Sequence, residues 1–339
     1  MEIVFVHFGP KPPKHLVSNI RRTCQLFPTH QIILLTDQLQ NIRIESENFG
    51  VRKIQVQDEY SEIYSGLSHP KDFRGNFWFA SLARLTAICD YLIENNQPIL
   101  HIESDVLISG DFPTEKFLEL DRPIAYTIIG EKSGVASVFW INSSSAALKL
   151  KQFISTSVKK DPNTTDMKIL GLFQFTCGNL VRTLASFPLM EKSAYSGLST
   201  SLTEDFQYTF DLFGGYFDAA DIGQYLLGDD PRNHRGVKYL RRELSTSYLR
   251  PRSLSYSYST SRIFLNIETG SSSKLFSLHV HSKMLNVFKP ETGPKILRDS
   301  VDSQGKAERH VLIPQVFLSS LGNAVRRRFK LIPKVLRHD

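Results

Sequence analysis

Short apolar runs alternate with amphipathic stretches along the first third of the chain, a pattern typical of strands and helices that build a parallel sheet. The apolar runs predict strands at residues 2–7, 32–35 and 98–102, and the amphipathic stretches predict helices over about 14–26 and 77–95. The last of these strands, Pro98-Ile99-Leu100-His101-Ile102, is apolar enough to indicate a buried parallel strand. These elements predict an α/β fold.

Beyond residue 112 the alternation becomes less regular. Apolar runs at 123–129 and 135–141 predict antiparallel strands, so we expect a central mixed, mainly parallel sheet flanked by helices. A helix is expected at about 143–158, and a further strand at 275–281. The segment 243–262 is rich in Ser, Tyr and Arg, and we expect it to form a mobile loop or lid.

Size and composition indicate an ordinary globular protein with one elaborated domain, because 339 residues with 41% hydrophobic and 22% charged residues can bury a sizeable core. Neither a signal-peptide pattern nor a run of about 18 apolar residues occurs, so we expect a cytoplasmic protein. The three cysteines, Cys24, Cys89 and Cys177, are far apart and lack metal-finger spacing. They are interpreted as reduced thiols.

The net charge of +7 is concentrated at the C-terminus, where residues 324–339 carry six Lys or Arg against one Asp. This distribution argues against a nucleic-acid-binding face spread over the rest of the chain, and we expect no nucleic-acid partner. Apolar residues recur among these cations at near-helical spacing, which predicts a surface helix that contacts an anionic membrane, peripherally and on its inner face. A solvated or frayed basic terminus is the alternative.

The acidic triplet Glu103-Ser104-Asp105 follows the strand expected at 98–102 and is a candidate metal-binding motif. Two carboxylates separated by one residue can reach one hard divalent cation, which needs few protein ligands when substrate phosphates complete its coordination. Open α/β sheets bind ligands at the carboxyl ends of their strands. The alternative is that two acids follow a strand without a function.

The run Leu100-His101-Ile102-Glu103-Ser104-Asp105-Val106 resembles the DxD or ExD motif of GT-A nucleotide-sugar glycosyltransferases, including bacterial polysaccharide glycosyltransferases. This resemblance implies a GT-A-like single catalytic domain over 1–290, with a nucleotide-sugar-binding half at 1–142 and an acceptor-side half at 143–290. Residues 291–339 are then a basic extension. The implied activity is metal-dependent transfer of a sugar from a nucleotide-diphosphate donor to a hydroxyl of a glycan or glycolipid. A UDP-sugar is the favoured donor.

The resemblance extends to a histidine near the C-terminus, in Leu278-His279-Val280-His281-Ser282-Lys283. In an extended strand His279, His281 and Lys283 face one side, so an imidazole can join a metal while the ammonium meets a phosphate. His281 is favoured over His279 because it directly precedes the Ser-Lys pair. The implied metal ligands are Asp105, His281 and Glu103. Imidazole favours manganese over magnesium.

Donor binding is expected at the ends of the first two strands, because the base and ribose lie there in the GT-A class. The implied nucleotide-sugar-binding residues are His7, Phe8, Gly9, Thr36, Asp37, Arg84, Glu103, Ser104 and Lys283. Arg84 lies on the helix before the acidic triplet, where the class often carries Arg or Lys that contacts carboxylate or phosphate. The alternative for Arg84 is a solvated arginine on the helix surface.

The segment from Tyr216 to Asn233 resembles the acidic strand-to-helix segment that lines the acceptor side in GT-A enzymes. Asp218, and after it Asp221, is the candidate catalytic carboxylate, which would accept the proton of the acceptor hydroxyl or orient the two sugars. The alternative is that one of these aspartates caps the helix that contains Gln224.

Other function classes lack their motifs. The chain contains no P-loop, no GxGxxG fingerprint and no nucleophile elbow, which argues against kinases, dehydrogenases and serine hydrolases. A nucleotidyltransferase acting on sugar phosphates stays an alternative, although the loop Gly9-Pro10-Lys11-Pro12-Pro13-Lys14 resembles its Gly-rich basic loop only in two lysines. A noncatalytic sugar-binding protein of the same fold is the other alternative.

Overall fold

The computed structural model describes residues 1–41, 50–56, 60, 64–69, 76–129, 132–186, 199–227, 254–259, 262–267, 272–281 and 283. The basic segment 324–339 and its expected surface helix lie outside these residues, as does the part of the expected loop at 243–253. Across the described ranges, no helix combines the length and apolar character needed to span a membrane.

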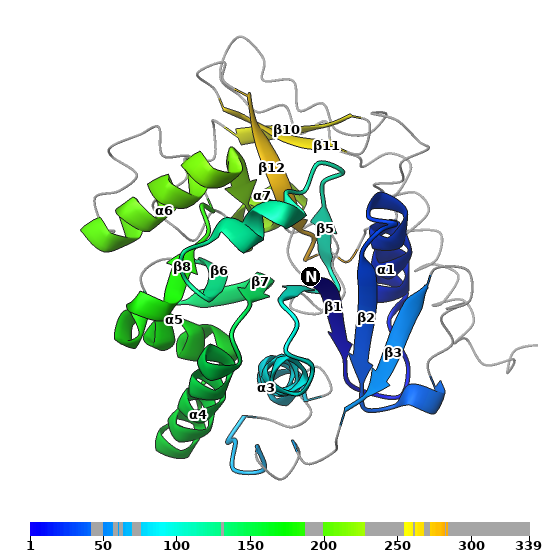
Figure 1. Ribbon diagram of the computed structural model, residues 1–339, viewed down its shortest axis with the longest axis vertical. Coiled ribbons are helices and arrows are strands. Elements are labelled where there is room, and N and C mark those ends of the chain that lie inside the picture. Colours follow the sequence, from blue (N-terminus) through cyan, green and yellow to red (C-terminus); the bar gives the residue numbers. More distant parts are fainter. Residues whose placement is uncertain are drawn as a thin grey trace, which may run out of the picture.

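The first third of the chain folds into the strands and helices that its pattern predicts (Figure 1). The elements in order are β1 (Glu2–His7), α1 (Lys14–Leu26), β2 (Gln31–Thr36), η1 (Leu39–Asn41), β3 (Val51–Gln55), α3 (Phe77–Asn95), β4 (Ile99–Ile102) and β5 (Val106–Ile108). Asn96 caps the C-terminus of α3: it takes the left-handed conformation with φ 52° and donates its N–H to the carbonyl of Leu92. The strands β3 and β5 were not predicted; β5 has only three residues, too few to show a period.

The second third supplies further strands and most of the remaining helices. These elements are η3 (Thr114–Glu119), β6 (Ile124–Ile128), β7 (Gly134–Ile141), α4 (Ser144–Lys160), α5 (Asp166–Thr176), η4 (Gly178–Leu180), β8 (Val181–Thr183), α6 (Thr200–Phe213), β9 (Gly215–Phe217) and α7 (Asp221–Leu227). Ser143 caps α4 by accepting a hydrogen bond from the N–H of Ala146, at the start of the helix expected over about 143–158.

The central sheet is mixed and mainly parallel, as predicted. Among the described residues, seven strands pair in the order β3-β2-β1-β4-β7-β6-β8. The pairs of β3, β2, β1 and β4 are parallel, β7 runs antiparallel to both β4 and β6, and β8 returns parallel to β6. The strand β4 therefore lies in the middle of the sheet, where the parallel half meets the antiparallel pair.

Alternate side chains of each central strand point to opposite faces of the sheet, and each face packs into its own hydrophobic core. Val4 of β1 packs with the apolar faces of α3, α4 and α5, whereas Ile3 and Phe5 pack with α1 and with a cluster of aromatic rings around Phe117. Both faces of the sheet are covered, which is why β4 is buried at every position and is apolar except at His101, whose Nδ1 lies 2.9 Å from the carbonyl of Val4.

A second, smaller sheet contains the C-terminal strands, and it corrects the expectation of a mobile loop over the whole of 243–262. Residues Leu254–Ser259 form β10 and Arg262–Ile267 form β11, paired as an antiparallel hairpin. Leu and Tyr alternate with Ser along β10, and this period of two is a strand pattern that the polar composition concealed. The next strand, β12 (Ser272–His279), begins and ends earlier than predicted and runs from the hairpin toward the middle of the view in Figure 1.

Candidate active site

The acidic triplet lies where the two sheets meet. Glu103 follows the last residue of β4, and its N–H donates to the carbonyl of Ser137 in β7 at 3.0 Å. After the triplet the chain enters β5, which leaves the large sheet and pairs antiparallel with β12, opposing Val106 to His279. The N–H of Val280 then donates to the carbonyl of Asp105 at 2.8 Å. This pairing brings the C-terminal histidines beside a motif about 175 residues earlier in the chain.

The helix α1 supports the backbone of the triplet from the other side. The side-chain amide of Asn19, which is 1% exposed, donates to the carbonyls of Glu103 at 3.3 Å, Ser104 at 3.4 Å and Val106 at 2.8 Å. The hydroxyl of Ser104 lies 3.3 Å from Nε2 of His15. Sequence reasoning missed Asn19 and His15, because no local signal ties a helix at residues 14–26 to a turn some 85 positions later.

Asp105, His279 and His281 form a group that can hold a metal ion. Within the described residues, one ligand atom from each of the three lies within 4.8 Å of the others. Oδ2 of Asp105 is 3.3 Å from Nε2 of His279, and the two imidazole rings stack with centroids 4.0 Å apart. The structure thus brings both histidines, rather than His281 alone, to the carboxylate.

The hydrogen bonds of His279 suit a metal ligand. Its Nδ1 lies 2.8 Å from the carbonyl of Ala219, and because a carbonyl only accepts, Nδ1 carries the proton. Nε2 is then turned toward Asp105 with its lone pair free for a cation when the imidazole is neutral. A ligating histidine commonly donates its other ring N–H to a carbonyl in this way. One carboxylate and two imidazoles fit manganese, with remaining positions for phosphate oxygens.

Electrostatics also favour a cation at this position. Burial by itself would lower the pKa of His279, but the carboxylates of Asp105 and Glu103 outweigh it and raise the pKa to about 9. Burial would raise the pKa of Asp105, yet the neighbouring Lys283 and His279 hold that pKa well below its usual value. The carboxylate of Asp105 therefore stays ionised at neutral pH and attracts positive charge.

Arg84 is largely buried, with its side chain 16% exposed, and it lies between two acids. It ion-pairs with Glu103 and, through Nη2, with Oδ2 of Asp166 at 3.2 Å. Burial would lower the pKa of Arg84, but Glu103 and Asp166 outweigh burial and raise it. The other oxygen of Glu103 lies 3.4 Å from Nε2 of His279. Asp166, the first residue of α5, was missed as a site residue because its partner is 82 positions away.

The carboxylate of Asp218 accepts hydrogen bonds from backbone N–H groups of both α7 and β12. It accepts from Ile222 at 3.1 Å, Gly223 at 2.8 Å and His279 at 2.9 Å, and it is wholly buried. Burial outweighs these donors and raises the pKa of Asp218 to about 6. The hydrogen bonds from Ile222 and Gly223 show that Asp218 caps α7, which is the alternative role considered for it from the sequence. Asp221 is the first residue of α7 and is half-buried.

Two further contacts place α7 against the histidines. Nε2 of Gln224 lies 3.4 Å from Nε2 of His281, a contact that the sequence did not indicate. Gly223 has no room for a side chain, because a Cβ there would lie 1.9 Å from the carbonyl oxygen of His279. The absence of a side chain at Gly223 is therefore what lets α7 approach the end of β12.

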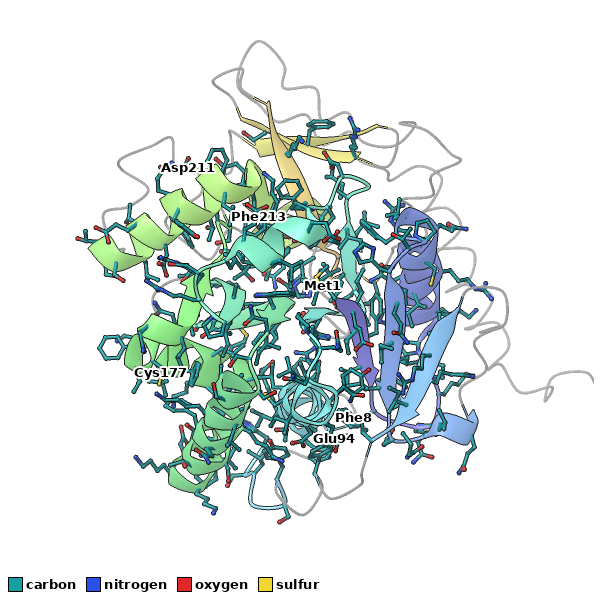
Figure 2. All side chains as sticks on the ribbon, in the orientation of Figure 1. Met1, Phe8, Glu94, Cys177, Asp211 and Phe213 are labelled. Atoms are coloured by element: carbon teal, nitrogen blue, oxygen red, sulfur yellow. The ribbon has the colours of Figure 1, made fainter. Side chains whose placement is uncertain are left out.

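The residues expected to bind the donor come together at the ends of β1 and β2. The N–H of Gly9, at φ 111°, donates to Oδ1 of Asp37 at 2.8 Å, which joins the loop after β1 to the loop after β2. Thr36 is buried and its hydroxyl accepts from the N–H of Gln38 at 3.2 Å. Burial lowers the pKa of His7. The ring of Phe8 meets Phe79 of α3 edge-on at 6.4 Å, and Figure 2 shows Phe8 beside that helix.

Comparison with known proteins finds similarity to glycosyltransferase structures. No protein-family model and no curated protein sequence matches the chain. Among solved structures, it is similar to the galactosyltransferase LgtC in complex with donor and acceptor sugar analogues, with 18% identity, 59% of this chain and 79% of that chain covered, and a TM-score of 0.38. Mouse xyloside xylosyltransferase 1 has 8% identity over 56% of this chain and 88% of that chain, with a TM-score of 0.39.

A third similar structure is the glycosyltransferase GlyE of Streptococcus pneumoniae TIGR4, with 16% identity, 62% of this chain and 50% of that chain covered, and a TM-score of 0.34. All three of these structures are glycosyltransferases. Identities and TM-scores this low identify no substrate and no residue role.

Proposed function

We propose that this protein is a metal-dependent glycosyltransferase that moves a sugar from a nucleotide-diphosphate donor, a UDP-sugar in the first instance, to a hydroxyl of a glycan or glycolipid. The observation that carries this proposal is the convergence of Asp105, His279 and His281 at the carboxyl end of the central strand β4. Ligands of open α/β sheets bind at that edge. A carboxylate and imidazoles next to an ammonium, Lys283, suit a cation that holds a diphosphate.

The residues of the site divide into ligands and positioning groups. Asp105, His279 and His281 would hold Mn²⁺ or Mg²⁺, and Arg84 fixes Glu103 close to His279. The chemistry that such a cation supplies is Lewis-acid stabilisation of the negative charge on the leaving diphosphate. Lys283 would add a positive charge toward the phosphates. The linked ends of β1 and β2, at Gly9 and Asp37, are where we place the nucleoside.

Asp221 is our candidate for contact with the acceptor, because Asp218 is buried and holds the backbone of α7 and β12. Replacing Asp221 with Asn is expected to lower turnover while leaving Mn²⁺ binding unchanged. Turnover equal to that of the wild-type protein would exclude this role for Asp221.

The test of the activity is incubation of the purified protein with Mn²⁺ and a panel of nucleotide sugars, with and without a chelator. Asp105→Asn keeps the shape of the side chain but removes its charge, and it is expected to lower donor hydrolysis or transfer by about 100-fold or more. The matched control is Asp211→Asn, on the exposed surface of α6 (Figure 2), which should retain the wild-type rate.

Three outcomes would contradict the proposal. Pyrophosphorolysis of the nucleotide sugar would identify a nucleotidyltransferase, and binding of the sugar without turnover would identify a noncatalytic protein. Wild-type turnover in Asp105→Asn would show that the reaction does not use this site.

We also propose that the protein works in the cytoplasm at the inner face of a membrane. This proposal rests on the basic segment 324–339 and on the unpaired, buried cysteines. Removing residues 324–339 is expected to reduce cosedimentation with anionic vesicles but not with neutral ones. Equal cosedimentation of the full-length and truncated proteins with anionic vesicles would refute membrane contact through this segment.

A further inference from the structure

Lys283 ion-pairs with an oxygen of the carboxylate that forms part of the candidate metal site. Its ammonium contacts Oδ2 of Asp105, and that same oxygen lies 3.3 Å from Nε2 of His279. The three side chains that could hold a divalent cation therefore already have a positively charged side chain, Lys283, next to them.

A tight turn aims Lys283 at this oxygen. Lys283 takes the left-handed conformation, with φ 60°, which is uncommon for residues other than glycine. Its N–H donates to the carbonyl of Val280 at 2.8 Å, and the N–H of Val280 donates to the carbonyl of Asp105 at 2.8 Å. The backbone hydrogen bonds thus tie the turn directly to the residue that the ammonium contacts.

An ammonium and a divalent cation cannot share this oxygen without strong repulsion. The side chain of Asp105 is only 7% exposed and that of Lys283 is 25% exposed, so water screens the two positive charges poorly. A cation that binds Asp105 must therefore displace the ammonium of Lys283. Breaking that ion pair costs free energy, so the metal binds more weakly than it would without Lys283.

A diphosphate provides the displaced ammonium with a new partner. The backbone of Lys283 is held by the turn, but its flexible four-carbon side chain is partly exposed and can change direction. Phosphate oxygens bind lysine as a point charge and also complete the coordination of a divalent cation. When both ligands are present, the two cations can therefore separate, with the metal on Asp105 and the ammonium on the diphosphate.

From this geometry we propose that Lys283 couples metal binding to diphosphate binding, by occupying Asp105 until a diphosphate accepts its ammonium. The inference rests on the function proposed above and adds a binding order to it: the divalent cation binds weakly alone and tightly with the diphosphate. Because coupling between ligands is reciprocal, the diphosphate also binds weakly without the cation.

The test is titration with Mn²⁺, without and with inorganic pyrophosphate, after correction for the complex that the two form in solution. In the wild-type protein, pyrophosphate is expected to tighten Mn²⁺ binding by about 5–150-fold, the usual range of coupling between two ligands. Lys283→Met is expected to bind Mn²⁺ more tightly than the wild-type protein when pyrophosphate is absent, and to gain less on its addition. Lys283→Arg keeps the charge and should restore weak binding.

Lys274→Met is the matched control, because Lys274 lies on β12, the strand that leads to the turn of Lys283, is half exposed and pairs with Asp111 rather than with the site. It should bind Mn²⁺ as the wild-type protein does. The coupling role is overturned if Lys283→Met binds Mn²⁺ with wild-type or lower affinity, or if pyrophosphate does not tighten Mn²⁺ binding in the wild-type protein.

Asp105→Asn separates failure of this inference from failure of the proposed function. If Asp105→Asn abolishes Mn²⁺ binding while Lys283→Met leaves it unchanged, the metal site stands and the coupling role of Lys283 is wrong. If Asp105→Asn binds Mn²⁺ like the wild-type protein, the metal site itself is wrong, and both proposals fail.

Discussion

Gly223 is the position at which the first turn of α7 touches the end of β12. A Cβ at Gly223 would lie 1.9 Å from the carbonyl oxygen of His279 and 2.8 Å from Oδ2 of Asp218. The first distance is about 1.5 Å shorter than ordinary van der Waals contact, and the obstructing atom belongs to the backbone, so it cannot rotate away. In Gly223→Ala, either α7 or the end of β12 must move by about that distance.

Such a movement would break contacts on which the site depends. Oδ2 of Asp218 accepts from Gly223 at 2.8 Å and from His279 at 2.9 Å, and both hydrogen bonds lengthen beyond use if the elements separate. We therefore expect Gly223→Ala to lower the free energy of unfolding by about 1–3 kcal/mol, as overpacking of a tight contact does. Mn²⁺ affinity should fall by about 10–100-fold, the usual effect of disturbing the groups that orient a metal ligand.

The assays are urea unfolding and calorimetric titration with Mn²⁺, and Gly178→Ala is the control. A Cβ at Gly178 meets no atom within 4 Å, so this variant should stay within about 0.5 kcal/mol of the wild-type stability. If Gly223→Ala matches Gly178→Ala in both assays, α7 does not approach His279 as described. If only stability falls, α7 does not orient the metal ligands.

Two further predictions concern the charged groups of the site. Asp166→Asn leaves the largely buried Arg84 with Glu103 as its remaining acidic partner and is expected to lower the free energy of unfolding by about 1–3 kcal/mol. Asp161→Asn, which breaks an exposed pair with Lys168, should change the free energy of unfolding little. Equal losses for the two variants in urea unfolding would contradict this reasoning. In protein kept metal-free by a chelator, the raised pKa of His279, about 9 against 6.5, means that its charge stabilises the fold fully below pH 6.5 and that this stabilisation is lost as pH rises through 9. The same fall in the unfolding free energy in His279→Gln would exclude His279 as its source.

The local pattern of the chain was enough to predict the central elements. β1, α1, β2, α3, β4, β6, β7 and α4 match their predicted ranges closely, because a strand buried on both faces and a helix with one apolar face each carry their period within a short stretch of sequence. The acidic triplet was found for the same reason, since it directly follows a strand that is apolar at all but one position. Short or polar elements were missed: β5 has three residues, and Ser occupies every second position of β10.

The partners of the functional side chains depended on the path of the chain. Sequence reasoning could say that Arg84 contacts an acid or a phosphate, but only the packing of α3 against α5 and β4 brings Asp166 and Glu103 to it. Likewise, the choice between His279 and His281 rested on neighbouring residues, whereas the structure places both imidazoles beside Asp105.

The sequence by itself therefore determined the α/β architecture and the acidic triplet at the end of its central strand, because periodicity and motif spacing are properties of neighbouring residues. Tertiary structure decided the composition of the site. The pairing of β5 with β12 brings His279 to Asp105, and the capping of α7 by Asp218 holds that helix against the histidines. The first contact joins segments more than 160 residues apart, and the second depends on a hydrogen bond between Asp218 and His279, 61 residues apart. Only the burial of both sheets' apolar faces specifies how such segments meet.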